Sequence, residues 1–374
     1  MKTRWRNLPP LLLLWSVAAN ALDAVDTTQS QAMIDFLDVC HDGTVPPAAL
    51  EKVMGLPGTQ LIVAQQNNSR RITPVQYRAT LVSACRGEIP HLQPSEPGTR
   101  AEKGVEGLIG DVAPSLLWGR DHVAFLRQRL AAVKETQGLD EIVPLALQNL
   151  PEKVALSPRL YFVMGGRAGA AAIDNAIYID LLSDAWRTRE KNTPMIPQEI
   201  IEFFAHETHH LGYGEILERR KQSLRLASGP EQAWNFLASL LMEGSATLLV
   251  SAHGNWAELE KQDHIQPDLA RLPQLLPKAQ SLLRLTMNGR MSEQEHQAAV
   301  SDFFGEGYHA TGACLLNVIL EAQGKRGVFR VMRDPGKFLT VYNLCAAKIN
   351  QPFRFDSRLA TDLEHRLDRV DYSR

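Results

Sequence analysis

The sequence lacks a strong excess of charge of either sign, because 40 basic side chains face 42 acidic ones among 374 residues. That balance excludes a strongly basic nucleic-acid-binding protein. No interior stretch has the roughly 18 uninterrupted apolar residues that a bilayer-spanning helix needs. Apolar residues nevertheless make up 44% of the chain, which is more than a disordered protein carries. These features leave a folded globular chain of one large domain or two smaller ones.

The start of the chain predicts an export signal. Three basic residues among the first six precede the apolar run Leu11–Trp15, and Ala19 and Ala21 supply the small residues that a signal peptidase reads. We therefore expect a signal peptide over 1–21 and a bacterial protein that is periplasmic or secreted. An uncleaved anchor is the alternative, but the apolar run is short. No membrane span is expected after removal of the signal.

Cysteine is scarce, with four residues and no Cys-x-x-Cys pair, which excludes a zinc ribbon. An even number of cysteines in an exported chain favours disulfides. Three pairings are possible. Because the cysteines form an early and a late pair, we expect Cys40–Cys85 and Cys314–Cys345; free buried thiols are the alternative.

Hydrophobic periodicity indicates an α+β fold that is mostly helical. The alternating stretches Arg159–Met164 and Ala176–Leu181 predict two short strands joined by a glycine-rich segment. Beyond Pro197 the chain has helical periodicity almost throughout. Helices are predicted at 198–211, 231–252, 273–287, 292–304, 308–322 and 337–349.

The pattern His-Glu-x-x-His at 206–210 is the first sign of chemistry. Residues four apart on a helix differ by about 40° in direction and about 6 Å in height, so His206 and His210 can bind one ion. Glu207 lies close enough to reach a metal-bound water without being a ligand. Two histidines on an ordinary helix are the alternative. His209 points away from the pair, and we expect it outside the metal's ligand set, as we expect His253 and His296 to be solvated.

A catalytic zinc site needs a third protein ligand. The metzincin position six residues after His210 holds Ile216, and Gly212 and Gly214 are expected to end the helix. Glu243 is the better candidate, because a lone carboxylate in a strongly apolar helix is costly unless it is paired or binds a cation. A buried pair with an arginine is the alternative. The adjacent Gly244 would let another backbone approach closely.

Two motifs, His206-Glu207-x-x-His210 and Glu243-Gly244-x-Ala246, resemble the gluzincin division of the zincin metallopeptidases. More narrowly, residues 150 to 350 resemble a bacterial family of zinc-dependent peptidases still classed as a domain of unknown function. The later segment Tyr308–Gly312 and the Gly324 turn belong to the same resemblance.

The resemblance implies one Zn²⁺ per chain held by His206, His210 and Glu243, with Glu207 as general base and then proton donor. It also implies that the strand at 176–181 is the edge strand along which a peptide substrate lies.

A hydrogen-bond donor to the oxyanion of the reaction is expected near the start of the helix at 308. The family pattern has a tyrosine three residues before the glycine, where this chain has His309, with Tyr308 just ahead. Either side chain could donate to the oxyanion. The alternative is that both merely begin a helix.

The sequence thus predicts an exported zinc metallopeptidase that acts on peptide or protein substrates with a zinc-activated water and Glu207 as base. Two alternatives remain open: a non-catalytic binding or envelope-assembly protein with a structural or vestigial site, and a zinc amidase acting on cell-wall peptides. The predicted division is a helical region and linker over 22–105, a zincin-like domain over 106–350, and a tail or helix over 351–374. No nucleic-acid partner is expected.

Overall fold

The computed structural model describes residues 25–40, 43–70, 72–93, 100–165, 169–182, 197–224, 228–262, 265–305 and 307–367. The predicted signal peptide, 1–21, lies outside these ranges. The described chain is mostly helical with one small sheet, which confirms the α+β prediction.

The chain up to residue 147 forms short helices. They are α1 (Thr28–Asp38), α2 (Pro47–Gly55), α3 (Pro57–Arg70), α4 (Pro74–Arg86), α5 (Arg100–Gly107), a π-helical turn η1 (Leu108–Val112), α6 (Ala113–Asp121), α7 (Val123–Lys134), a 3-10 turn η2 (Leu139–Glu141) and α8 (Ile142–Leu147). Local signals set their ends. In α4, Thr73 and Gln76 form a reciprocal capping box, and Gly87 ends the helix with a φ of 82°.

The sheet has the strands β1 (Arg159–Val163), β2 (Ala170–Ile173) and β3 (Ala176–Asp180) in the order β1-β3-β2. β3 runs parallel to β1 and antiparallel to β2. The prediction that the 176–181 strand is an edge strand is therefore wrong: β3 is central, and all five of its residues are buried. β2 was not predicted, because Ala-Ala-Ala-Ile has no alternation of polar and apolar residues.

The two edges of the sheet differ. Asp26 lies along the outer side of β1, where its N–H donates to the Leu160 carbonyl at 2.8 Å and its carbonyl accepts from Phe162 N–H at 2.9 Å. Within the described ranges, no strand pairs with the outer side of β2. Of the two edge strands, β2 is therefore the one whose outer side has no such backbone contact in the described part of the chain.

The second half of the chain is helical, as predicted. Its elements are α10 (Pro197–Gln222), α11 (Ser228–Ser245), a π-helical turn η3 (Ala246–Ser251), α12 (Trp256–Leu259), α13 (Gln266–Ala270), α14 (Leu272–Met287), α15 (Glu293–Gly305), α16 (Tyr308–Arg333), a 3-10 turn η4 (Pro335–Lys337), α17 (Phe338–Lys348) and α18 (Ser357–Leu367). Gly324 has a φ of 69° and kinks α16.

α10 runs through Gly212 and Gly214, which were expected to end it. At Gly212 a Cβ atom would lie 2.5 Å from Leu150 Cδ1. The missing side chain therefore admits a close neighbour, and the glycine does not break the helix. The helix therefore continues past His210 as far as Gln222.

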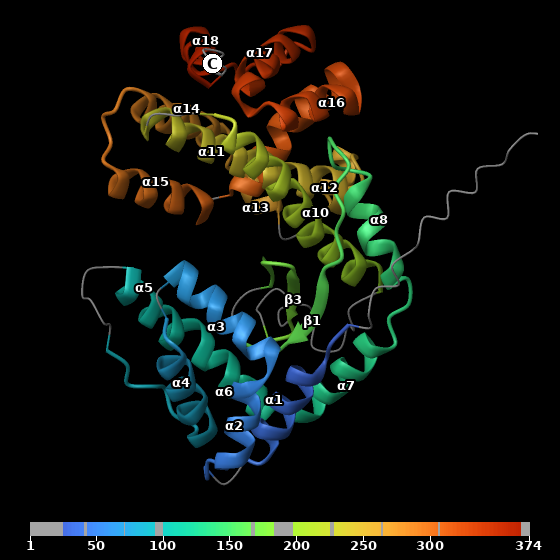
Figure 1. Cartoon of the computed structure of the whole chain (residues 1–374), viewed down its shortest axis with the longest axis vertical. Helices are drawn as coiled ribbons and strands as arrows, with labels where there is room; N and C mark the ends of the chain where they lie inside the picture. The colour runs from blue at the N-terminus through green and yellow to red at the C-terminus, as the bar shows by residue number, and fades with distance from the viewer. Residues whose placement is uncertain are drawn as a thin grey trace, which may run out of the picture.

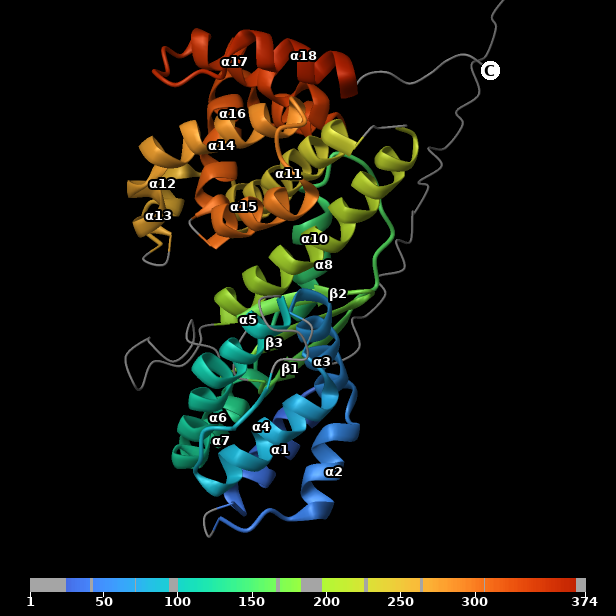
Figure 2. The same cartoon turned by 90° about the vertical axis from the view of Figure 1, so that its left-hand side faces the viewer.

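The structure has two hydrophobic cores, and α10 contributes residues to both. The N-terminal core joins α1–α4, α6, α7, the sheet and the first part of α10, and includes Phe36, Tyr77, Leu126, Phe162, Ile179 and Phe204. The C-terminal core joins the rest of α10 to the later helices, and includes Tyr213, Leu237, Leu241, Leu316, Leu339 and Phe338. Figure 1 shows α1, α2, α6 and α7 below the sheet and α11, α14 and α16 above it. In Figure 2, α10 extends from beside β2 into the upper half.

One helical stretch, Gly229–Ser251, has the length and apolar character of a membrane span, and 83% of its most apolar window is buried. It packs against α16 in the C-terminal core. At the crossing, a Cβ on Gly244 would lie 2.3 Å from the Gly312 carbonyl carbon. The close backbone approach expected at Gly244 is confirmed.

One of the two expected disulfides is present. Cys40 and Cys85 are bonded and tie the end of α1 to the end of α4. The expected Cys314–Cys345 bond is wrong, because both thiols are free. They lie on the neighbouring helices α16 and α17 but have different partners. The Cys345 thiol forms a hydrogen bond with Gln323, and Cys314 interacts electrostatically with Glu321.

Candidate metal centre

The two motif histidines lie on one face of α10, at the boundary between the two cores. Ala205 and Leu211 pack with the N-terminal core, whereas Tyr213 belongs to the C-terminal core. The rings of His206 and His210 have centroids 4.6 Å apart and are nearly perpendicular. The helix thus presents both imidazoles to the same point, as the spacing predicts.

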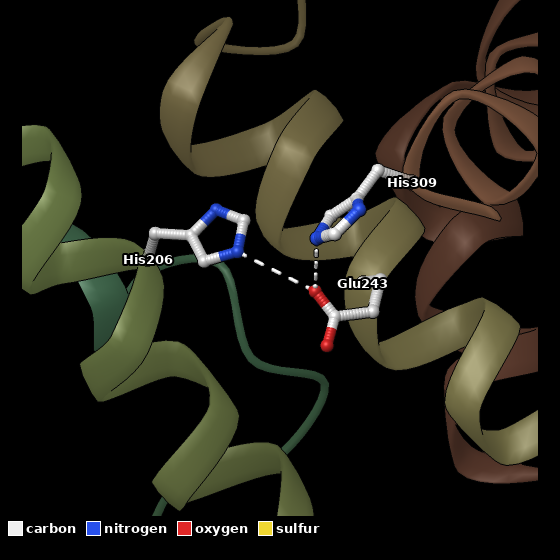
Figure 3. Close-up of side chains that lie close together, drawn as sticks. All are labelled: His206, Glu243 and His309. Atoms are coloured by element: carbon white, nitrogen blue, oxygen red, sulfur yellow. Dashed lines mark ion pairs between the residues drawn. The ribbon is translucent and has the colours of Figure 1, made fainter. Parts of the chain in front are cut away.

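Glu243 projects toward this point from α11. Its Oε2 atom lies 3.0 Å from Nε2 of His210 and 3.6 Å from Nε2 of His206. Ligands at about 2.1 Å from a tetrahedral zinc are about 3.4 Å from one another, so these separations suit a shared ion. The alternative of a buried pair with an arginine is not what the structure shows, since the carboxylate faces imidazoles (Figure 3).

The surroundings of Glu243 call for a cation. The residue is only 8% exposed, and its Oε2 atom makes no hydrogen bond of normal geometry within the described residues. Burial alone would raise the pKa of Glu243, but His210, His206 and His309 hold it well below its usual range. A buried carboxylate that stays charged among imidazoles matches the donor set of a zinc site.

The two histidines respond to this carboxylate differently. Burial and the neighbouring His210 lower the pKa of His206 to about 4, so this ring is neutral and able to bind a metal. Burial would also lower the pKa of His210, but Glu243 raises it to about 9. Without a metal, a proton on His210 therefore supplies the positive charge next to Glu243.

Glu207 lies beside the two histidines of the motif. One possible ligand atom from each of His206, Glu207 and His210 lies within 4.8 Å of the other two. Loss of solvent raises the pKa of Glu207 to about 7. A carboxylate with a pKa near neutrality is suited to accept and return a proton.

α16 brings Tyr308 and His309 to the same place. Nε2 of His309 lies 2.9 Å from Oε2 of Glu243, and its side chain is 46% exposed (Figure 3). The Tyr308 hydroxyl hydrogen-bonds to Glu243, and burial, then Glu243, raise its pKa. The structure thus brings together all six residues that the sequence singled out.

Ser251, at the end of η3, is a residue that the sequence did not reveal. Its Oγ lies 3.0 Å from Nδ1 of His206, and its carbonyl accepts a hydrogen bond from Gln262 at 3.1 Å. When Nδ1–H donates to Oγ, the lone pair of Nε2 faces Glu243. Ser251 belongs to no recognisable sequence motif. The π-helical turn also points its side chain in a different direction from the one that a regular α-helix would give.

Ser251→Ala is expected to lower zinc affinity by about 10- to 100-fold, the usual effect of losing the group that orients a ligand histidine. Competition with a chromophoric chelator would measure it. Ser223→Ala, at the exposed end of α10, is the matched control and should bind zinc normally. Unchanged affinity in Ser251→Ala would show that the hydroxyl does not orient His206.

Other residues lie outside the centre. His209 is fully buried and belongs to neither group of possible metal ligands. His296 is 6% exposed, so its expected solvation is wrong. The basic residues Arg220 and Lys221 form ion pairs with Asp334 at 3.6 Å and with Glu231 at 2.9 Å.

A family model with the description "Putative zinc dependent peptidase (DUF5700)" matches residues 119–351. The chain belongs to this family. The matched range contains the sheet, α10, α11 and α16, and therefore every residue of the centre. The family resemblance seen in the sequence is confirmed. No curated protein and no solved structure matches the chain significantly.

Proposed function

We propose that this member of the family is an exported zinc-dependent peptidase with its active site at His206, Glu207, His210 and Glu243. The observation that carries the proposal is the convergence of two imidazoles and a buried carboxylate from separate helices, with Glu207 beside them. A purely structural site has no use for this extra carboxylate. Export rests on the predicted signal peptide.

His206, His210 and Glu243 would hold Zn²⁺, which when bound lowers the pKa of water and polarises a carbonyl. The chain's own residues perform the proton transfers. Glu207 accepts a proton from the attacking water and delivers it to the amine that leaves. The hydroxyl of the partly buried Tyr308, which hydrogen-bonds to Glu243, would exchange that bond for one to the oxyanion.

The sheet suggests where a substrate lies. β2 packs beside α10 and offers an edge with no strand partner within the described ranges, whereas β3 is enclosed between β1 and β2. We propose that an extended peptide adds to β2 through main-chain hydrogen bonds. This replaces the expectation that it pairs with the 176–181 strand.

Metal binding is tested by measuring the zinc content and the melting temperature of the purified protein. We expect one zinc per chain, loss of that zinc in Glu243→Ala, and a lower Tm when a chelator is added. Glu231→Ala is the control, because Glu231 lies on α11 and pairs with Lys221 at 2.9 Å, away from the centre. Absence of zinc with melting unchanged by chelator would favour the non-catalytic alternative.

A further inference from the structure

His309 lies where a metal ligand would lie. Its Nε2 atom is 2.9 Å from Oε2 of Glu243, compared with 3.0 Å for His210 and 3.6 Å for His206. His206, Glu243 and His309 also form a group whose ligand atoms lie within 4.8 Å of one another. Three imidazoles thus approach a single carboxylate oxygen, and by distance His309 cannot be separated from the other two.

We infer that His309 is a fourth protein ligand that closes the metal site in the resting protein. This inference rests on the metal site of the proposed function. Three histidines and one glutamate fill the four positions of tetrahedral zinc, whereas a catalytic site keeps one position open for water or substrate. His309 must therefore leave its position before the site can act. The resting centre is then a gated site.

The exposure of the four side chains identifies which one can move. Those of His206, His210 and Glu243 are 14%, 11% and 11% exposed, whereas that of His309 is 46% exposed. His309 also lies in the first turn of α16, where it is an exposed residue. Rotation of this one side chain opens the position and leaves the other three ligands packed.

The backbone beneath His309 is fixed. Gly312, one turn further along α16, meets Gly244 so closely that a Cβ on Gly312 would lie 2.9 Å from Gly244 Cα. Since Gly244 follows Glu243, the two helices hold His309 and Glu243 at a set distance. The gate is therefore a side-chain rotation and not a helix movement. Tyr308, which hydrogen-bonds to Glu243, takes no part in this rotation.

Cobalt substitution tests the inference without relying on activity. Co²⁺ in the wild-type full chain should show the intense visible absorption of a four-coordinate site, and added azide should change it little. In His309→Ala, water takes the fourth position, so azide should bind and change the spectrum. If His309 occupies the site in 99% of molecules, apparent azide affinity should rise about 100-fold in the variant.

His253→Ala is the matched control, because His253 is a half-exposed histidine bonded to Glu202 outside the centre. It should keep the wild-type spectrum and azide affinity. His309→Gln, measured beside His309→Ala, guards against a folding defect, and circular dichroism checks both. Equal azide affinity and identical spectra in wild type and both His309 variants would overturn the fourth-ligand role.

The result also separates this inference from the proposed function. If Glu243→Ala loses cobalt while His309→Ala has the wild-type spectrum, the metal site stands and His309 is not a ligand. If the wild-type chain binds no cobalt or zinc, both the metal site and the gate are wrong. Azide binding confined to the His309 variants supports the gate.

Discussion

Glu207→Gln is expected to keep its zinc and to lose about 10²- to 10⁴-fold of its peptide hydrolysis, the usual contribution of a general base. The amide has the same shape as the carboxylate but accepts no proton. In the proposed site the metal is held by His206, His210 and Glu243, which this change leaves intact, so metal content should not fall. Peptides cut by the wild type and by the variant, compared by mass spectrometry, would measure the loss and reveal the cleavage preference.

Glu215→Gln is the matched control for this experiment. It makes the same chemical change on α10, at an exposed residue whose nearest ion-pair partner, Arg219, is 3.9 Å away. Activity should be unchanged. Full hydrolytic activity in Glu207→Gln would rule out the proposed proton transfer.

Gly312→Ala is expected to have the largest effect on stability. Its Cβ would lie 2.2 Å from the Leu240 carbonyl oxygen and 2.9 Å from Gly244 Cα, both backbone atoms that no side-chain rotation can move. The two helices must separate, at a cost of about 3 kcal/mol or more, which corresponds to a fall in Tm of about 4 °C or more for a chain of this length. Because Glu243 and His309 flank this contact, zinc affinity should fall as well. Calorimetry and metal analysis would measure both effects.

Gly214→Ala provides the comparison. Gly214 is also a helical glycine, but nothing lies within 4 Å of where its Cβ would be. There the substitution should stabilise the helix by up to about 1 kcal/mol and leave zinc binding unchanged. A stable, zinc-loaded Gly312→Ala would mean that α11 and α16 tolerate a wider separation than the structure implies.

The site was largely predictable because each of its parts has a local signature. The spacing of His206 and His210 fixes their common face on a helix, and Glu243 is conspicuous because its neighbours are apolar. Gly244 likewise indicates a close helix contact, which the structure has. These features depend on residues near each other in sequence, so periodicity and composition reveal them.

What the sequence could not predict depends on long-range packing. β2 has only alanines and one isoleucine, and the central place of β3 follows from β2 being present. Cys314 and Cys345 lie on adjacent helices, but which way each thiol points is decided by packing. His296 lies in a polar stretch of sequence, yet the fold buries it.

The position of α10 across two cores has a consequence for when the protein becomes active. Ala205 packs in the N-terminal core and Tyr213 in the C-terminal core, so the part of α10 that carries His206 and His210 is fixed at both ends only after both cores have formed. Metal coordination tolerates only about ±0.2 Å in ligand distance. A half-folded chain would therefore hold zinc poorly and cut nothing, and completion of folding would itself switch on the proposed peptidase.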